Sequence, residues 1–178
     1  MKTLTWDEAL TLMSPHPYAL VSTMDAQGRA NLMGVGWWTI VSWEPRMLAI
    51  AIGRRRYTRE CLDHCPEFAL CVPGVSVAEG AWLCGMESGR DVDKWERGGF
   101  RAVPAETIRP PLFEGATVAF ECRVVNRVEC GDHLVYIGEV LAIRGDPDQA
   151  MHLYTIHYRR AVAIDPSLTV RNDLDLKR

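Results

Sequence analysis

The first candidate for binding chemistry is a run of three arginines, Arg54, Arg55 and Arg56, followed directly by Tyr57 and Thr58. A guanidinium group offers a planar fork of N–H donors that suits a phosphate. A threonine in front of a helix can cap it, and the free N–H groups at a helix start favour an anion. Taken alone, three arginines at a strand end are more typical of a solvated rim. With the buried strand before them and the helix start beside them, they make a phosphate site plausible.

Three tryptophans, Trp37, Trp38 and Trp43, precede the arginines in a glycine-spaced segment. Aromatic side chains stack well on flat rings, so this segment could form a wall for a planar ligand. Successive residues of a strand point to opposite faces, so Trp37 and Trp38 cannot have the same role. The alternative is packing in the core or in a dimer, which we expect for at least one of the three.

The chain is rich in cysteine, with Cys61, Cys65, Cys71, Cys84, Cys122 and Cys130. Cys61, His64, Cys65 and Cys71 are four possible zinc ligands, but their spacing matches no common structural zinc pattern. Cys71 also lies in an apolar run, where a free cysteine behaves as a small hydrophobic residue. We therefore predict buried, reduced thiols and no metal site.

The elements that would position these residues are short. A continuous apolar run at residues 47–52 predicts a buried strand that delivers the arginines to a rim, and residues 57–65 have helical character. Further strands are predicted at residues 18–24, 29–35, 37–42, 67–72, 118–124 and 134–143, with one or two more within 151–164. Helices are predicted from the capping-box spacings at Thr5 and Ser76, the second ending near Leu83, and a short helix at 91–97. Residues 101–116 are predicted as loop and 165–178 as a polar surface tail.

About eight short strands with helices between them predict a mainly β fold, a β-barrel decorated by helices. With 178 residues, one domain spanning 1–178 is expected. The net charge of −3 argues against a nucleic-acid-binding surface. No run of about 18 apolar residues and no signal-peptide pattern occurs, so we expect no membrane span and a cytoplasmic protein.

Three segments in order carry a resemblance to a known family. They are residues 31–58, the stretch Ser88-Gly89-Arg90-Asp91-Val92-Asp93-Lys94-Trp95, and Gly131-Asp132-His133 followed by Gly138-Glu139-Val140. Together they resemble the flavin reductase-like domain, a family that includes the flavoredoxins. The resemblance implies an FMN-binding split barrel and a homodimer with FMN near the subunit interface.

The resemblance also implies roles for individual residues. It places the isoalloxazine ring along Gly36 to Ser42, a segment that contains Trp37, Trp38 and Thr39. It places the phosphate near the arginine run with Tyr57 and Thr58, without fixing which arginine binds it. In an extended chain, Arg54 and Arg56 would share a side and Arg55 would face the other way.

Several polar residues have two interpretations. Asn31 and Ser42 could bond flavin edges, or they could satisfy a turn and a strand end. The resemblance places His133 near the nicotinamide or the flavin, as a binding group more than an acid, whereas a simple turn histidine is the alternative. Asp91 is expected to cap a helix, with neighbouring charges locking a loop, because flavin chemistry needs no carboxylate pair.

The sequence is consistent with three functions. The leading hypothesis is an FMN-dependent NAD(P)H:flavin reductase that uses NADH or NADPH as co-substrate. The second is a flavoredoxin-type electron-transfer protein that lacks a nicotinamide site and is reduced by a protein partner. The third is a nucleic-acid or phospholigand binder that uses Arg54–Arg56, which the negative net charge disfavours.

Overall fold

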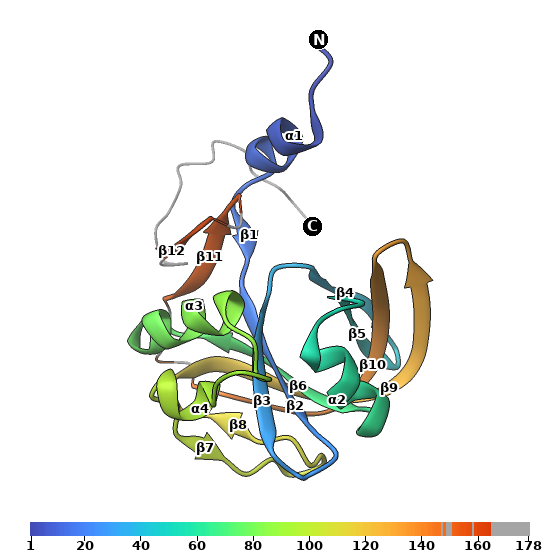
Figure 1. The fold of residues 1–178 in the computed structure, drawn as a ribbon, viewed down its shortest axis with the longest axis vertical. Coiled ribbons are helices and arrows are strands. Elements are labelled where there is room, and N and C mark those ends of the chain that lie inside the picture. The colour runs from blue at the N-terminus through green and yellow to red at the C-terminus, as the bar shows by residue number, and fades with distance from the viewer. Residues whose placement is uncertain (147, 149–150, 158, 165–178) are drawn as a thin grey trace.

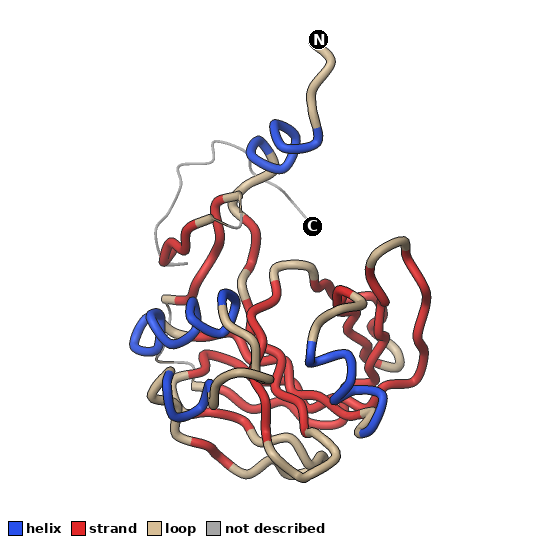
Figure 2. The backbone as a smooth tube through the Cα atoms, in the orientation of Figure 1, coloured by secondary structure: helices blue, strands red, loops and turns tan. Residues whose placement is uncertain are grey.

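A computed structural model describes residues 1–146, 148, 151–157 and 159–164 of the chain (Figure 1). Strands dominate the described residues, and the helices lie between and around them (Figure 2). The prediction of a mainly β fold is therefore confirmed. The predicted polar tail at 165–178 lies outside the described residues.

The main sheet has seven antiparallel strands in the order β3-β2-β6-β9-β10-β5-β4. Their bounds are β2 (Ala19–Met24), β3 (Ala30–Val35), β4 (Trp38–Trp43), β5 (Arg46–Gly53), β6 (Glu67–Pro73), β9 (Ala116–Cys130) and β10 (His133–Gly145). The hairpin of β9 and β10 pairs His133 with Cys130, and β10 also pairs His133 with Gly53 of β5. This register brings the tip of the hairpin to the end of β5, where the arginine run begins.

Two smaller sheets complete the described strands. The first has the order β1-β11-β12, with β1 (His16–Pro17), β11 (His152–Ile156) and β12 (Arg160–Ile164). Of the one or two final strands predicted within 151–164, the structure has two, β11 and β12. The second pairs β7 (Ala102–Val103) with β8 (Leu112–Phe113). The loop prediction for 101–116 was wrong at these four residues, because a two-residue strand is too short to show an alternating pattern. It was also wrong at Ala116, where β9 begins.

The helices are α1 (Trp6–Leu12), α2 (Tyr57–His64), α3 (Ala78–Met86) and α4 (Lys94–Arg97), with a 3₁₀ turn at Val75–Val77. α1 begins with the predicted capping box: the Glu8 backbone N–H donates to the Thr5 hydroxyl at 3.3 Å, and the Thr5 N–H donates to the Glu8 carboxylate at 2.8 Å. Within the described residues, no helix has the length and hydropathy to cross a membrane.

The predicted caps of α3 and α4 were wrong. Ser76 lies inside the 3₁₀ turn, so α3 starts after Val77 without a side-chain cap, and it runs past Leu83 to Met86. At α4 the cap is Asp93, whose carboxylate accepts from the backbone N–H groups of Trp95 and Glu96 at 2.9 and 3.3 Å. Asp91 lies two residues too early to reach them.

The core forms on both faces of the main sheet. Val21, Ile50 and Phe68 belong to a cluster on one face, whereas Leu20 and Ala81 belong to a cluster under α3. Neighbouring residues of β2 alternate between the two clusters, as the two-residue period of a strand requires.

The predicted burial of the cysteines is confirmed for five of the six, and Cys130 at the hairpin tip is exposed. All six thiols are free. Burial raises the pKa of the Cys71 and Cys84 thiols to about 12, so they stay protonated near neutral pH. Among the described residues, no three His, Cys, Asp or Glu side chains are grouped so that they could hold a metal ion.

Candidate functional site

An open cavity of about 470 Å³ lies where the ends of β3 and β5 meet α3, β10 and β11. We term it the ring cavity. It is lined by Tyr18, Met33, Gly34, Val35, Gly36, Trp37, Ala51, Gly53, Arg56, Trp82, Gly85, Met86, His133 and Thr155. Its volume falls in the range of roughly 300–1,000 Å³ that is typical of small-molecule sites.

One wall of the ring cavity is an aromatic pair, Trp37 and His133. Their ring centroids are 4.6 Å apart with planes inclined by 37°. The Trp37 backbone carbonyl accepts a hydrogen bond from the Ala51 N–H at 2.9 Å, which holds this loop against β5. The Trp37 side chain is 41% exposed, so an aromatic surface remains open to a ligand.

His133 is held by its neighbour Asp132. The His133 Nδ1 atom lies 2.7 Å from a carboxylate oxygen of Asp132. This hydrogen bond lowers the pKa of the Asp132 carboxyl, so the carboxylate stays ionised and favours a proton on Nδ1. A Cβ on Gly53 would lie 3.7 Å from Nε2, which places that ring atom at the cavity wall.

The other residues of the tryptophan segment lie elsewhere. Trp38 packs against the core cluster of the main sheet, and Trp43 is 82% exposed at the end of β4. The opposite orientation of Trp37 and Trp38 is thus as predicted. Thr39 is exposed with its hydroxyl on the Ile40 carbonyl, and neither it nor Ser42 borders the ring cavity. Only the start of the predicted segment, Gly36 and Trp37, reaches this cavity.

Two glycines let α3 form the opposite wall. A Cβ on Gly34 would overlap the Tyr18 hydroxyl and lie 2.9 Å from the Gly85 Cα atom. The Tyr18 hydroxyl donates to the Ala81 carbonyl at 2.9 Å. Because neither glycine carries a side chain, β3 and α3 approach closely around this hydrogen bond, and Trp82 and Met86 are brought to the cavity.

A second cavity of about 150 Å³ continues from the first, sharing Met33 and Arg56 with it. We term it the basic cavity. Its lining is Asn31, Met33, Arg55, Arg56, Tyr57, Thr58, Glu87, Ser88, Gly89, Arg90 and Lys94. Four of these side chains are cations and one is an acid, so the cavity has the charge expected of an anion site.

The three arginines have different surroundings. Arg54 donates to the Gly131 carbonyl at 2.8 Å and pairs with Glu129 at 3.0 Å on the hairpin surface, away from the basic cavity. Arg55 and Arg56 both border it. The extended-chain expectation for their sides was wrong, because the Arg56 N–H donates to the Gly53 carbonyl at 2.9 Å and closes a turn.

Thr58 does not cap α2, which corrects the sequence prediction. The N-cap is Arg56, no side chain caps the helix, and Thr58 lies in its first turn. Instead, the buried Thr58 hydroxyl accepts a hydrogen bond from the Asn31 side-chain amide at 3.1 Å. Both residues therefore form the floor of the basic cavity, and the first N–H groups of α2 lie beside it.

Lys94 is a site residue whose position the sequence did not reveal. It is only 4% exposed, and its Nζ donates to the carbonyls of Leu32 and Cys84 at 2.8 and 2.9 Å. Burial lowers the pKa of this ammonium group. The Ser-Gly-Arg-Asp motif that precedes it was the available signal, but only the tertiary fold carries Lys94 beneath the cavity.

The outer wall of the basic cavity is a polar network around Tyr57. The Arg90 guanidinium lies 5.3 Å from the centre of the Tyr57 ring and donates to Glu60 at 2.6 Å. The Tyr57 hydroxyl donates to the buried carboxylate of Asp25 at 2.8 Å. Burial by itself raises the pKa of Asp25, but hydrogen bonds from Arg29 and Tyr57 outweigh it and lower the pKa to about 2.

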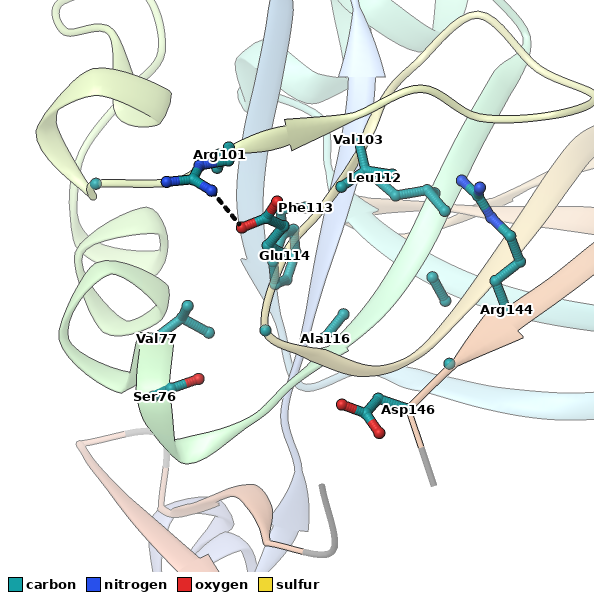
Figure 3. Close-up of a pocket in the computed structure, with 14 residues that line it drawn as sticks. Ser76, Val77, Arg101, Val103, Leu112, Phe113, Glu114, Ala116, Arg144 and Asp146 are labelled. Atoms are coloured by element: carbon teal, nitrogen blue, oxygen red, sulfur yellow. Dashed lines mark ion pairs between the residues drawn. The ribbon is translucent and has the colours of Figure 1, made fainter. Parts of the chain in front are cut away.

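A larger and shallower pocket of about 680 Å³ lies beside β8 and β9 (Figure 3). Arg101 and Glu114 form an ion pair of 3.2 Å at its edge, and Arg144 donates to the Pro104 carbonyl at 2.5 Å. These cations already have partners, and none of the predicted site residues lines this pocket. The ring and basic cavities are therefore the candidate site.

The profile of the Flavin reductase like domain matches residues 12–162, which include every residue that lines the two cavities. The chain belongs to this family. It is 32% identical over 126 residues to an uncharacterized protein of Archaeoglobus fulgidus, covering 71% of this chain and 70% of that protein. It is 27% identical over 145 residues to a Streptomyces pristinaespiralis protein named NADH:riboflavin 5′-phosphate oxidoreductase, covering 81% and 78%.

Two solved structures share the fold of this chain. A flavoredoxin from Methanosarcina acetivorans superposes with a TM-score of 0.78 at 24% identity, covering 92% of each chain. A putative flavin reductase with a split barrel domain from Shewanella frigidimarina gives a TM-score of 0.80 at 16% identity, covering 89% of this chain and 87% of that one. The predicted split barrel is confirmed.

Proposed function

We propose that this flavin reductase-like chain is an FMN-dependent oxidoreductase that accepts electrons from NADH or NADPH and passes them to a further acceptor. The observation that carries the proposal is the continuity of the ring cavity with the basic cavity through Met33 and Arg56. A ligand that fits both has a flat ring at one end and an anion at the other. FMN has this form, and its phosphate carries a charge near −2 at neutral pH.

The residues present fit that cofactor. In this proposal Arg55, Arg56 and the start of α2 bind the phosphate, and Lys94 adds positive charge beneath it. Trp37 and the α3 side chains flank the ring. When bound, FMN supplies two-electron chemistry with a reduced nicotinamide, and the protein supplies binding, orientation and electrostatics.

His133 has a binding role in this proposal. Its hydrogen bond to Asp132 fixes the orientation of the imidazole, and its contact with Trp37 keeps the ring at the mouth of the cavity. From that position it can contact the amide or the ring of an incoming nicotinamide. This is a binding role, because hydride transfer between nicotinamide and flavin requires no carboxylate or imidazole acid.

We also propose a homodimer. Trp6, Leu12, Ile40 and Trp43 are large apolar side chains that are more than half exposed in one chain. Exposed apolar surface of this kind is typical of a protein interface. Ile40 and Trp43 lie on β4, which follows Trp37 directly, so an interface there would lie close to the ring cavity.

The visible spectrum of the purified protein tests the proposal. We expect a yellow protein, or one that becomes yellow with added FMN, at about one flavin per chain. Anaerobic addition of NADH or NADPH should then bleach the flavin absorbance. A protein whose fluorescence and calorimetry show no interaction with FMN would refute the cofactor assignment.

The same experiment separates the reductase from the electron-transfer alternative. A flavin-loaded protein that dithionite bleaches but neither nicotinamide reduces would belong to the electron-transfer class. Steady oxidation of NADH or NADPH with added FMN would instead establish the reductase.

A further inference from the structure

Thr155 is a buried residue of β11 with an unsatisfied hydroxyl. It is 1% exposed, and its Oγ1 atom has no hydrogen-bond partner among the residues that the structure describes. Thr155 also lines the ring cavity, although no sequence motif points to it. Buried hydroxyl groups are nearly always hydrogen-bonded, so an exception at a cavity wall calls for an explanation.

The direction of the side chain follows from the strand. Residues two apart in a strand share a face, so Leu153 and Thr155 project from the same side of β11. Leu153 packs in the buried cluster that contains Tyr18, and Tyr18 lines the ring cavity as Thr155 does. Thr155 therefore faces the body of the protein, where the ring cavity lies.

Two other polar groups of the lining already have partners. The Tyr18 hydroxyl donates to the Ala81 carbonyl, and His133 Nδ1 is paired with Asp132. Arg56 lies at the junction with the basic cavity. Thr155 thus contributes the side-chain hydroxyl that can both donate to and accept from a ligand in the ring cavity.

We propose that the Thr155 hydroxyl forms a hydrogen bond to the polar pyrimidine edge of the bound flavin ring and so orients the ring in the cavity. That edge carries carbonyl and N–H groups, which match a group that both accepts and donates. The inference rests on the proposed function, since it assigns a positioning residue within the same site. It also gives the buried hydroxyl a partner, which valine, a residue of similar shape, could not bond.

The proposal predicts opposite effects on stability and on binding. Thr155→Val removes the hydroxyl with little change of shape. It should therefore lower the affinity for FMN and for riboflavin alike, by about three- to tenfold for the loss of one neutral hydrogen bond. In the flavin-free protein the same change removes an unsatisfied group and should raise the melting temperature by about 2–4 °C. Thr155→Ser keeps the hydroxyl and should retain most of the affinity.

Flavin fluorescence titration and thermal unfolding of the wild type and the variants provide the test. Thr39→Val is the matched control, because the Thr39 hydroxyl is exposed, bonded to the Ile40 carbonyl and outside the cavity. If Thr155→Val folds poorly, Thr155→Ala compared with Thr155→Ser gives the same contrast.

The outcomes separate this inference from the proposed function. Equal flavin affinity in wild type and Thr155→Val overturns the role of Thr155, and so does a lower melting temperature of the flavin-free variant. If Thr155→Val weakens the binding of NADH alone and leaves the flavin affinity unchanged, Thr155 does not bond the flavin edge. A wild type that binds no flavin overturns the proposed function itself.

Discussion

The phosphate contacts give the sharpest test of the site, because the three arginines separate into two groups. Arg55 and Arg56 border the basic cavity, whereas Arg54 is bound to the hairpin tip through Gly131 and Glu129. The double change of Arg55 and Arg56 to alanine should therefore weaken FMN binding. Arg54→Ala is a matched control of the same residue type, one position earlier in the chain.

The size of the effect follows from the kind of contact. A hydrogen bond to a charged group contributes roughly 1.5–3 kcal/mol net. Arg55 and Arg56 are both exposed, so the lower end applies, and two contacts give about 3 kcal/mol. The preference for FMN over riboflavin should fall by about a hundredfold in the double variant. Riboflavin binding should change little, because the ring contacts lie in the other cavity.

Quenching of flavin fluorescence measures the affinities of the wild type and of each variant for FMN and for riboflavin. Raising the ionic strength should weaken FMN binding more than riboflavin binding, because salt screens exposed charges. Arg55 and Arg56 are not the phosphate contacts if the double variant keeps the wild-type ratio of FMN to riboflavin affinity, and they are not the only ones if Arg54→Ala lowers that ratio as much. In the first case the arginines are a solvated rim, and in the second the hairpin tip takes part in phosphate binding.

Three further predictions follow from the described contacts. Asp25→Asn should lower the free energy of unfolding by about 2 kcal/mol at neutral pH, because the pKa of Asp25 falls from 3.8 to about 2 on folding. This contribution is present above pH 4 and is lost as the pH falls through 2. Denaturation curves of the wild type and of Asp25→Asn should therefore converge in acid. One thiol per chain, Cys130, should react with a thiol reagent in the native protein, and all six after unfolding; more than one in the native state would contradict the burial of the others. Light scattering should find a homodimer at micromolar concentration, and a monomer with FMN bound would argue against the proposed interface.

The sequence by itself determined most of the elements and the general position of the site. The period of apolar residues predicted the main strands, and the capping box at Thr5 predicted the start of α1, because these signals depend on neighbours within a few residues. The arginine run and the tryptophan segment marked the two regions that border the cavities. The same local rule separated Trp37 from Trp38, since adjacent strand residues face opposite ways.

Only the tertiary structure decided which of those residues meet. Arg54 is drawn to the hairpin because the register of β5 with β10 places Gly131 and Glu129 beside it. The Thr58 hydroxyl accepts a hydrogen bond from Asn31, 27 residues earlier in the chain, instead of capping its own helix. Thr155 reaches the ring cavity from a segment without a local signal, and the motif that contains Lys94 does not show that this lysine lies beneath the basic cavity. Such contacts depend on strand order and register, which no short stretch of sequence encodes.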